Sequence, residues 1–175
     1  MMWTVGHSNR PLAEFLAMLQ AHGVELLVDV RKVPRSGHNP QFDRESLPKS
    51  LAEVGIDYLH MPGLGGLRHP HKDSINTGWR NTSFRGYADY MQTAEFEENL
   101  TALERLAYDR SVAIMCAESV PWRCHRSLIA DALTARGVEV SHIMSAGKAN
   151  PHNLTEFAQV EGGKVTYPSR ELDLF

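Results

Sequence analysis

Ser111 to Ser127, with the sequence SVAIMCAESVPWRCHRS, is the stretch of the chain that decides the fold. Its first part, Val112 to Met115, is an apolar run typical of a buried β-strand. The run breaks at Cys116, and a helical pattern begins at Arg123. The stretch therefore predicts a strand, a loop and a helix start in direct succession. Ligands of parallel α/β proteins bind where strands end and the following helices begin, so we expect the active site here.

The length and composition indicate a single domain over residues 1–175. The chain has 175 residues, of which 42% are hydrophobic, and this is enough for one full core. No apolar run approaches the ~20 residues that span a bilayer, and the N-terminus lacks a signal-peptide pattern. The sequence thus predicts a cytoplasmic protein that does not bind a membrane.

The net charge and the cysteine count restrict the chemistry. The formal net charge of -3 argues against nucleic-acid binding by bulk electrostatics, so such binding would need a local basic patch. The chain has two cysteines, Cys116 and Cys124. Because they lie close together in a chain without a secretory signal, they indicate free thiols or ligands rather than a disulfide framework.

The hydrophobic pattern outside the central stretch predicts an alternation of strands and helices. Short apolar runs predict strands at 3–6, 25–30, 56–60, 112–115 and 138–144. Helical spacing predicts helices at 11–22, 47–54, 87–108 and 123–136. Such an alternation favours right-handed crossovers and parallel pairing. We expect one Rossmann-like α/β domain with a mostly parallel five-stranded sheet and helices on both faces.

Three segments are expected to be irregular. A loop at 33–46 is rich in turn formers, and a long excursion at about 61–86 contains five glycines. The tail at about 145–175 is less regular, and Gly162 and Gly163 in it predict a hairpin turn. Long loops inside compact domains are more often functional than idle.

Polar residues follow the predicted strands, where the carboxyl ends of parallel strands meet at one edge of the sheet. So many polar and charged side chains at one edge of the sheet indicate a functional site, because the fold itself does not require them. These residues are His7, Ser8 and Asn9; Asp29 and Arg31; His60; Cys116 and Glu118; and His142.

The central stretch supplies the candidate catalytic groups. Cys116 could simply be a small residue that ends a buried strand. Cys124 lies near a predicted helix N-terminus beside basic residues, so we expect the pKa of its thiol to be lowered. Glu118 is a candidate general base or ligand, and His125 a candidate acid or base. Arg123 and Arg126 either solvate the helix start or hold a phosphate or carboxylate.

Other motifs are weaker. The spacing from Cys116 to Arg123 is one residue too long for a phosphatase loop. Zinc or iron could be held by Cys116 and Cys124 with a histidine such as His7 or His125, although no paired CxxC or HExxH motif supports this. The glycines at 63–66 resemble turn chemistry more than a nucleotide loop. The segment GWRNTSFRGYADY, 78–90, could stack bases, or its rings could pack the excursion onto the sheet.

Several motifs together resemble a known family. TVGHSNRPLAEFLAMLQAHGVELLVDVRKVPRSGHNPQFDRESL, GYADYMQTAEF, MCAESVPWRCHRSLIADAL and PHNLTEFA closely resemble the bacterial and archaeal family called domain of unknown function 488. The similarity runs from Thr4 to about Pro168. It implies an α/β Rossmann-like fold, and it implies little about activity.

The residues that match the recurrent motifs of this family fall mostly on the predicted functional edge, so motif and topology point to one site. They are His7, Ser8, Asp29, Arg31, Asn39, Pro40, Phe42, Tyr87, Cys116, Glu118, Arg123, Cys124, His125, Arg126, Pro151, His152, Leu154 and Thr155.

The leading hypothesis is a cysteine-dependent hydrolase or transferase acting on an anionic substrate, such as a phosphate on a nucleotide or nucleic acid. Its catalytic residues would be Cys116, Glu118, Cys124 and His125. Its substrate-binding residues would be His7, Ser8, Asp29, Arg31, Asn39, Tyr87, Arg123, Arg126 and His152. One alternative is a metal-binding enzyme that uses the same cysteines. The other is a non-catalytic nucleotide or nucleic-acid binding module.

Overall fold

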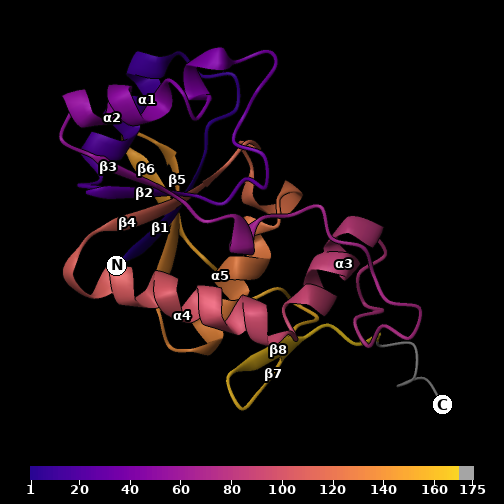
Figure 1. The fold of residues 1–175 in the computed structure, drawn as a ribbon. Helices are drawn as coiled ribbons and strands as arrows, with labels where there is room; N and C mark the ends of the chain where they lie inside the picture. The colour runs from indigo at the N-terminus through magenta and orange to yellow at the C-terminus, as the bar shows by residue number, and fades with distance from the viewer. Residues whose placement is uncertain (170–175) are drawn as a thin grey trace.

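The computed structural model describes residues 1–169, which form a six-stranded mixed sheet in the order β3-β2-β4-β1-β5-β6 (Figure 1). Five strands are parallel, and β6 runs antiparallel to β5 at one edge. The strands are β1 (Met2–Gly6), β2 (Leu26–Asp29), β3 (Asp57–His60), β4 (Val112–Cys116), β5 (Val140–Ser145) and β6 (Lys148–Pro151).

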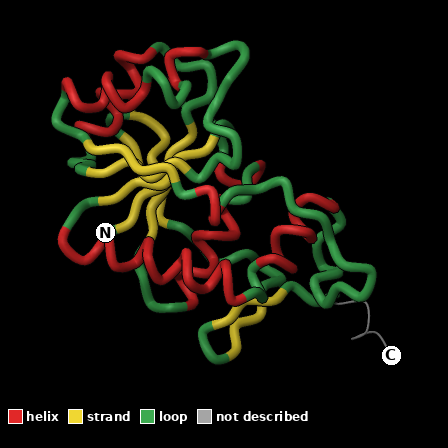
Figure 2. Tube along the Cα trace, viewed as in Figure 1, coloured by secondary structure: helices red, strands yellow, loops and turns green. Residues whose placement is uncertain are grey.

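Helices cover both faces of this sheet (Figures 1 and 2). The helices α1 (Leu12–Ala21) and α2 (Leu47–Glu53) lie on one face. The helices α4 (Ala94–Asp109) and α5 (Arg126–Ala135) lie on the other, and α3 (Thr82–Tyr90) extends the layer of α4 and α5 outward. Short 3-10 turns occur at Pro40–Phe42, Pro62–Leu64 and Pro121–Arg123.

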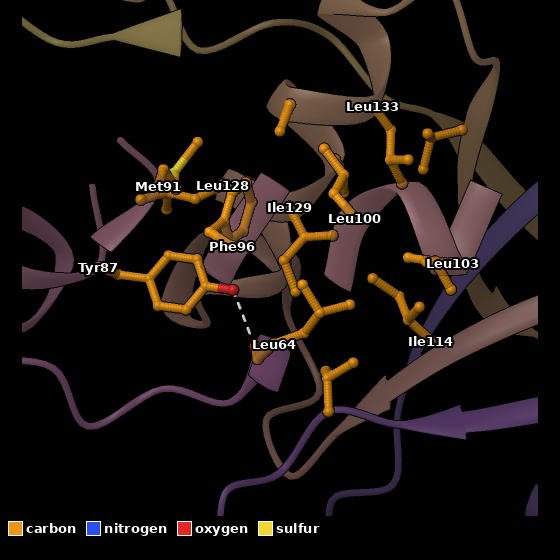
Figure 3. Close-up of a cluster of buried hydrophobic side chains, with 14 of the residues drawn as sticks. Leu64, Tyr87, Met91, Phe96, Leu100, Leu103, Ile114, Leu128, Ile129 and Leu133 are labelled. Atoms are coloured by element: carbon orange, nitrogen blue, oxygen red, sulfur yellow. Dashed lines mark hydrogen bonds between the residues drawn. The ribbon is translucent and has the colours of Figure 1, made fainter. Parts of the chain in front are cut away.

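Strand β4 packs against helices on both faces of the sheet, and its sequence shows why. Its side chains alternate, so Val112, Ile114 and Cys116 join the core under α4 and α5, whereas Ala113 and Met115 join the core under α1 and α2. All five residues of the strand are buried. A strand that is covered on both sides reads as a continuous apolar run, which is the pattern of VAIMC. Figure 3 shows Ile114 within the larger core, with leucines from α4 and α5.

The strand order places β4 between β2 and β1. After β1 the chain passes through α1 to β2, on one side of this pair, and after β4 it passes through α5 to β5, on the other side. The direction of winding thus reverses at β1 and β4. A crevice outside the carboxyl ends of the strands is expected at such a reversal.

All five predicted strands are present, but the predicted strand count is wrong by one. The sixth strand, β6, has the sequence KANP and is mostly exposed, so it carries neither an apolar run nor a clean alternation. It forms because it pairs with the edge strand β5. The tail also contains the predicted hairpin, in which β7 (Gln159–Glu161) and β8 (Lys164–Thr166) flank Gly162 and Gly163 with φ of 60° and 79°.

The helix predicted at 87–108 is two helices. The Asn81 side chain accepts from the backbone N–H groups of Ser83 and Phe84, so α3 begins at Thr82 and the irregular excursion ends at Asn81 instead of near residue 86. Thr93 caps α4 in the same way. The helix predicted from Arg123 begins at Arg126, because the 3-10 turn at Pro121–Arg123 precedes it.

None of the helices within residues 1–169 combines the length and the apolar character needed to cross a membrane.

Candidate functional site

A cavity of about 320 Å³ opens at the carboxyl ends of β2 and β4. The long excursion and α3 supply its other walls. Both cysteines line it, together with basic, aromatic and acidic side chains: Arg31, Lys32, Arg35, Phe84, Tyr87, Glu118, Arg123 and His125. The structure therefore brings together the four residues that the sequence predicts to be catalytic.

Cys116 and Cys124 are buried free thiols that line the same cavity, and the Cys116 thiol donates to the backbone oxygen of Glu118 at 3.6 Å. Burial by itself would raise the pKa of Cys116, but the hydrogen bond from Cys124 and the positive charge of Arg126 outweigh it, so the pKa is lowered. Burial and the adjacent Cys116 raise the pKa of Cys124 well above its ordinary value. The surroundings therefore favour loss of the proton from Cys116 over loss of the proton from Cys124.

The prediction that the pKa of Cys124 is lowered is wrong, and the reason is structural. Helix α5 begins at Arg126, so Cys124 lies before it in an extended conformation, with φ of -136° and ψ of 148°. The residue is buried against the core and against the other thiol. Of the two sulfurs, the one at the end of β4 therefore has the lower pKa.

Arg126 is the most unusual charge near the site. Its side chain is fully buried, and its Nη2 donates to the backbone oxygen of Ser119 at 2.9 Å. Its Nε and Nη1 have no hydrogen-bond partner among the described residues, and none of the ion pairs within 1–169 includes it. A buried cation without a counter-ion costs several kcal/mol, on the order of that measured for broken buried pairs. The positive charge of Arg126 lowers the pKa of Cys116, and a thiolate there would offset part of this cost.

His125 stands beside the thiol pair as a neutral base. Its Nε2 lies 3.2 Å from the backbone oxygen of Val30, which can only accept, so Nε2 carries the proton. Burial lowers the pKa of His125 to about 4. Its Nδ1 lies 3.6 Å from the sulfur of Cys124. At neutral pH this ring can accept a hydrogen bond but does not supply a positive charge.

Two glycines allow the chain to close over the site. A Cβ on Gly6 would lie 1.6 Å from the backbone oxygen of Glu118, so only glycine lets the loop after β4 cross the end of β1. A Cβ on Gly66 would lie 3.1 Å from Nδ1 of His125. The glycines at 63–66 have no positive φ. The close approach of the His125 ring to the backbone at Gly66, and not the turn chemistry favoured from the sequence, therefore accounts for glycine at this position.

The open side of the cavity is basic. Lys32, Arg35 and Arg123 are exposed along its rim, and the exposed Glu118 is the acidic residue among its lining. Arg35 also lies 3.9 Å from Glu45, an exposed pair that contributes little. The rim therefore has the charge expected for a site that receives an anion.

Arg31 lines the cavity, but its guanidinium is already bound. It donates to both carboxylate oxygens of Asp29, at 2.9 and 2.7 Å, and to the backbone oxygen of Phe42 at 2.7 Å. Its Nη1 lies 3.3 Å from Nε2 of His7, whose ring stacks on Phe42. Tyr58 donates to Asp29 as well, at 2.6 Å. This buried network favours a supporting role for His7, Asp29 and Arg31 behind the cavity wall.

Tyr87 supports the cavity from α3. Its hydroxyl donates to the backbone oxygen of Leu64 at 2.8 Å (Figure 3). The centroid of its ring lies 4.9 Å from that of the His125 ring. Ser8 and Asn39 do not line the cavity. Ser8 has a φ of 49° in the turn after β1, and Asn39 precedes a 3-10 turn in the loop at 33–46.

His152 lies elsewhere, in a chain of buried polar groups that we call the polar clamp: Thr4, Asp131, His142, His152 and Tyr167. His142 contacts Thr4 Oγ1 through Nδ1 at 2.5 Å and His152 through Nε2 at 2.8 Å. His152 contacts Asp131 at 2.7 Å, and Tyr167 donates to Asp131 at 2.7 Å. The clamp joins β1, β5, α5 and the tail. His142 and His152 also line a second cavity of about 390 Å³.

The aromatic segment at 78–90 is used largely for packing. Trp79 contacts Phe84, Phe157 and Tyr167 edge-on or tilted, with ring centroids 4.8 to 5.5 Å apart. Tyr87 and Tyr90 are buried and donate to backbone oxygens of the excursion. These rings are therefore not displayed as a stacking platform for bases.

Within residues 1–169 no group of three or more His, Cys, Asp and Glu side chains is arranged to hold a metal ion. The two cysteines would thus need further ligands from outside this part of the protein to make a zinc or iron site.

Sequence reasoning missed three features. Lys32 and Arg35 line the cavity, and their positions shortly after the predicted second strand are a signal that could have identified them as site residues. The capping role of Asn81 has a signal, because an asparagine precedes a helical pattern there. Asp131 also has one, because a carboxylate within the apolar pattern LIADAL needs a partner once it is buried.

Comparison with known proteins gives one match. The model of the family described as "Domain of unknown function DUF488" matches residues 11–133, which is more than half of the chain. No curated protein and no solved structure matches the chain. The matched range includes the thiol pair, Arg126 and the basic rim, while His152 and the tail lie beyond it. The chain therefore belongs to the DUF488 family.

Proposed function

We propose that this protein is a cysteine-dependent enzyme that acts on a small anionic substrate, with Cys116 as its nucleophile. The observation that carries the proposal is the contact of two buried thiols beside a buried guanidinium that has no carboxylate partner among the described residues. A thiolate is the reactive form of cysteine, and a neighbouring cation and hydrogen-bond donor are what make one available at neutral pH.

The lowered pKa of Cys116 and the raised pKa of Cys124 support a division of roles between the two thiols. The Cys116 thiolate attacks an electrophilic carbon or phosphorus atom of the substrate and forms a bond to it. The leaving group departs with its bonding electrons and takes the proton of Cys124. Water then attacks the sulfur-bound intermediate, the second product leaves with the new oxygen atom, and the second proton of that water returns to Cys124. Both cysteines end as they began, so the cycle is a net hydrolysis.

The basic rim supports the choice of an anionic substrate. Lys32, Arg35 and Arg123 face solvent around a cavity whose volume is at the small end of ligand sites. Arginines suit the planar geometry of carboxylates and phosphates. Glu118 lies in the same lining, and its carboxylate supports a role in orienting the attacking water.

Alkylation kinetics test the proposal. Because its pKa is lowered, Cys116 is expected to react with iodoacetamide at a lower pH than an ordinary cysteine, whose thiol has a pKa of about 8.5. The ratio of the alkylation rate with anionic iodoacetate to the rate with neutral iodoacetamide is expected to be higher for Cys116 than for free cysteine. Arg123→Ala should remove that gain, whereas Arg105→Ala, an exposed position on α4, should not. Mass spectrometry of the peptides identifies the modified sulfur.

The outcomes are distinct. A Cys116 that reacts no faster than free cysteine at pH 7 would refute the thiolate. Equal behaviour of both reagents in the wild type and Arg123→Ala would refute the anion preference. In Cys124→Ser the apparent pKa of Cys116 is expected to change less than in a variant that loses Arg126, because serine can still donate a hydrogen bond to Cys116.

We also propose that the fold is of the Rossmann-like type and that the protein is cytoplasmic. The reversal of winding at β1 and β4 supports the first. The two free thiols support the second, because buried thiols in contact with one another persist where the medium is reducing.

A further inference from the structure

A second cavity lies on the other side of the loop after β4. Its volume is about 390 Å³, within the range of small-molecule sites. Pro121 and Trp122 of this loop and Ser127 of α5 form part of the lining. The other lining residues are Trp79, His142, Met144, Asn150, Pro151, His152, Asn153 and Thr155. Cys116 and Cys124 are not part of this lining, so the cavity is separate from the proposed catalytic site.

The lining of this second cavity has few ionisable side chains. None of its side chains is Asp, Glu, Lys or Arg, and burial, with the adjacent His152, holds the pKa of His142 at about 3, so that ring is neutral at pH 7. An anion or cation would find no partner here. The ligand that fits is therefore neutral.

Two indole rings define the shape of that ligand. Trp122 is 67% exposed, which is unusual for so large an apolar ring. A flat ligand that stacks on this ring would remove its apolar surface from water, which favours binding. Trp79 is held by edge contacts with Phe84 and Phe157, and its Nε1 is buried without a hydrogen-bond partner among the described residues. Met144, Pro121 and Pro151 add apolar surface. The site thus favours a planar aromatic ring.

Polar recognition comes from two free amides. Asn150 and Asn153 line the cavity, and their side chains make no hydrogen bond within the described residues. Each amide offers a donor and an acceptor side by side, the pattern that pairs with the edge of a nucleobase. By contrast, both ring nitrogens of His142 and of His152 are already bound within the polar clamp. The histidines form a rigid floor, and the asparagines remain for the ligand.

We propose that this second cavity binds a neutral planar heterocycle of the nucleobase class. The ring stacks against Trp122, and its polar edge pairs with the amides of Asn150 and Asn153. The assignment does not depend on the proposed cysteine chemistry, because it uses none of the residues of the first cavity.

Isothermal titration calorimetry with four nucleosides tests this assignment. Adenosine, guanosine, cytidine and uridine serve as neutral probes, and methyl glucoside as a neutral probe without an aromatic ring. At least one nucleoside is expected to bind at millimolar or lower concentration, and methyl glucoside is not. Trp122→Ala should weaken the binding about 5-fold to 100-fold, the range for loss of one stacked base. Asn153→Ala should change the order of preference among the nucleosides.

The controls separate this site from the rest of the protein. Tyr108→Ala removes another exposed ring, on α4, and should leave the affinity unchanged. Cys116→Ser should also leave it unchanged. Because Trp122 is exposed, its replacement leaves the core intact, and circular dichroism checks the fold. Binding of no nucleoside, equal binding of methyl glucoside, or undiminished binding in Trp122→Ala would each overturn the proposal.

Discussion

Arg126 carries a positive charge where water does not reach it. If the Cys116 thiolate is its counter-ion, Arg126→Met should raise the apparent pKa of Cys116, because both the attraction and the neighbouring donor groups are lost. The free energy of unfolding at pH 7 should change little, since Cys116 can take up a proton once Arg126 is replaced with an apolar group of similar volume, and no buried charge is then left unpaired. Absorbance of the thiolate near 240 nm against pH gives the pKa, and urea unfolding gives the stability.

Arg126→Lys is the matched control for this substitution. It keeps the charge, so the pKa of Cys116 should remain closer to its wild-type position than in Arg126→Met. An apparent pKa of Cys116 that is the same in Arg126→Met as in the wild type would contradict the argument.

His142 gives the protein a pH-dependent stability. Burial, together with His152, lowers its pKa to about 3, whereas a histidine in an unfolded chain titrates near ~6.5. Between these values the unfolded chain binds a proton that the native state does not. The free energy of unfolding should therefore fall as the pH falls from 6.5 towards 3, by up to ~1.4 kcal/mol per pH unit from this residue.

Urea unfolding at several pH values between 6.5 and 4.5 measures this slope. His142→Gln should make the slope shallower whatever its effect on stability at pH 7. His69→Gln, at an exposed position, should leave the slope as it is. An unchanged slope in His142→Gln would show that this ring is not the titrating group.

At the scale of elements, the loop between β4 and α5 depends on the glycine that ends β1. In Gly6→Ala the new Cβ would overlap the backbone oxygen of Glu118 and lie 2.8 Å from Nη1 of Arg126. The loop has to move, so the free energy of unfolding should fall by ~3 kcal/mol and the alkylation rate of Cys116 should change with it. Gly147→Ala, in the turn between β5 and β6, meets no atom within 4 Å and should be close to neutral. A stable Gly6→Ala variant with normal thiol reactivity would contradict this view of the loop.

The same loop shows how far sequence reasoning reaches. The apolar run VAIMC predicts β4, and the break after it predicts the site, because both signals are local. The start of α5 and the burial of Arg126 are not local. They follow from a 3-10 turn that shifts the helix by three residues and from packing that turns an arginine inward. For that reason the sequence places both thiols in the site but assigns the lowered pKa to the wrong one.

Strand β6 and the polar clamp show a similar limit. KANP has no strand pattern of its own and is a strand because β5 offers an edge. The clamp joins residues as far apart as Thr4 and Tyr167, and no spacing in the sequence relates them. What the sequence does show is that Asp131 lies within an apolar helical pattern, which predicts a buried carboxylate in need of donors.

At the scale of the whole molecule, Tyr167 joins the tail to the rest of the fold. Its hydroxyl donates to Asp131 of α5, its backbone N–H donates to Asn76 at 2.9 Å, and its backbone oxygen accepts from Gly78 at 2.8 Å. Asn76 in turn donates to Asp89 of α3 at 2.8 Å. A single residue therefore connects the helix behind the site, the long excursion and the tail.

Tyr167→Phe removes one hydroxyl and leaves the ring packing in place. Oδ2 of the buried Asp131 then loses its tyrosine donor, so the free energy of unfolding should fall by ~1–3 kcal/mol. Amide hydrogen exchange should become faster in β7 and β8 and around Asn76, and should change little in β4, if the tail and the excursion open together. Tyr108→Phe, at an exposed position, should change neither quantity. A loss below ~0.5 kcal/mol, or faster exchange confined to the tail, would mean that the excursion is held in place without the clamp.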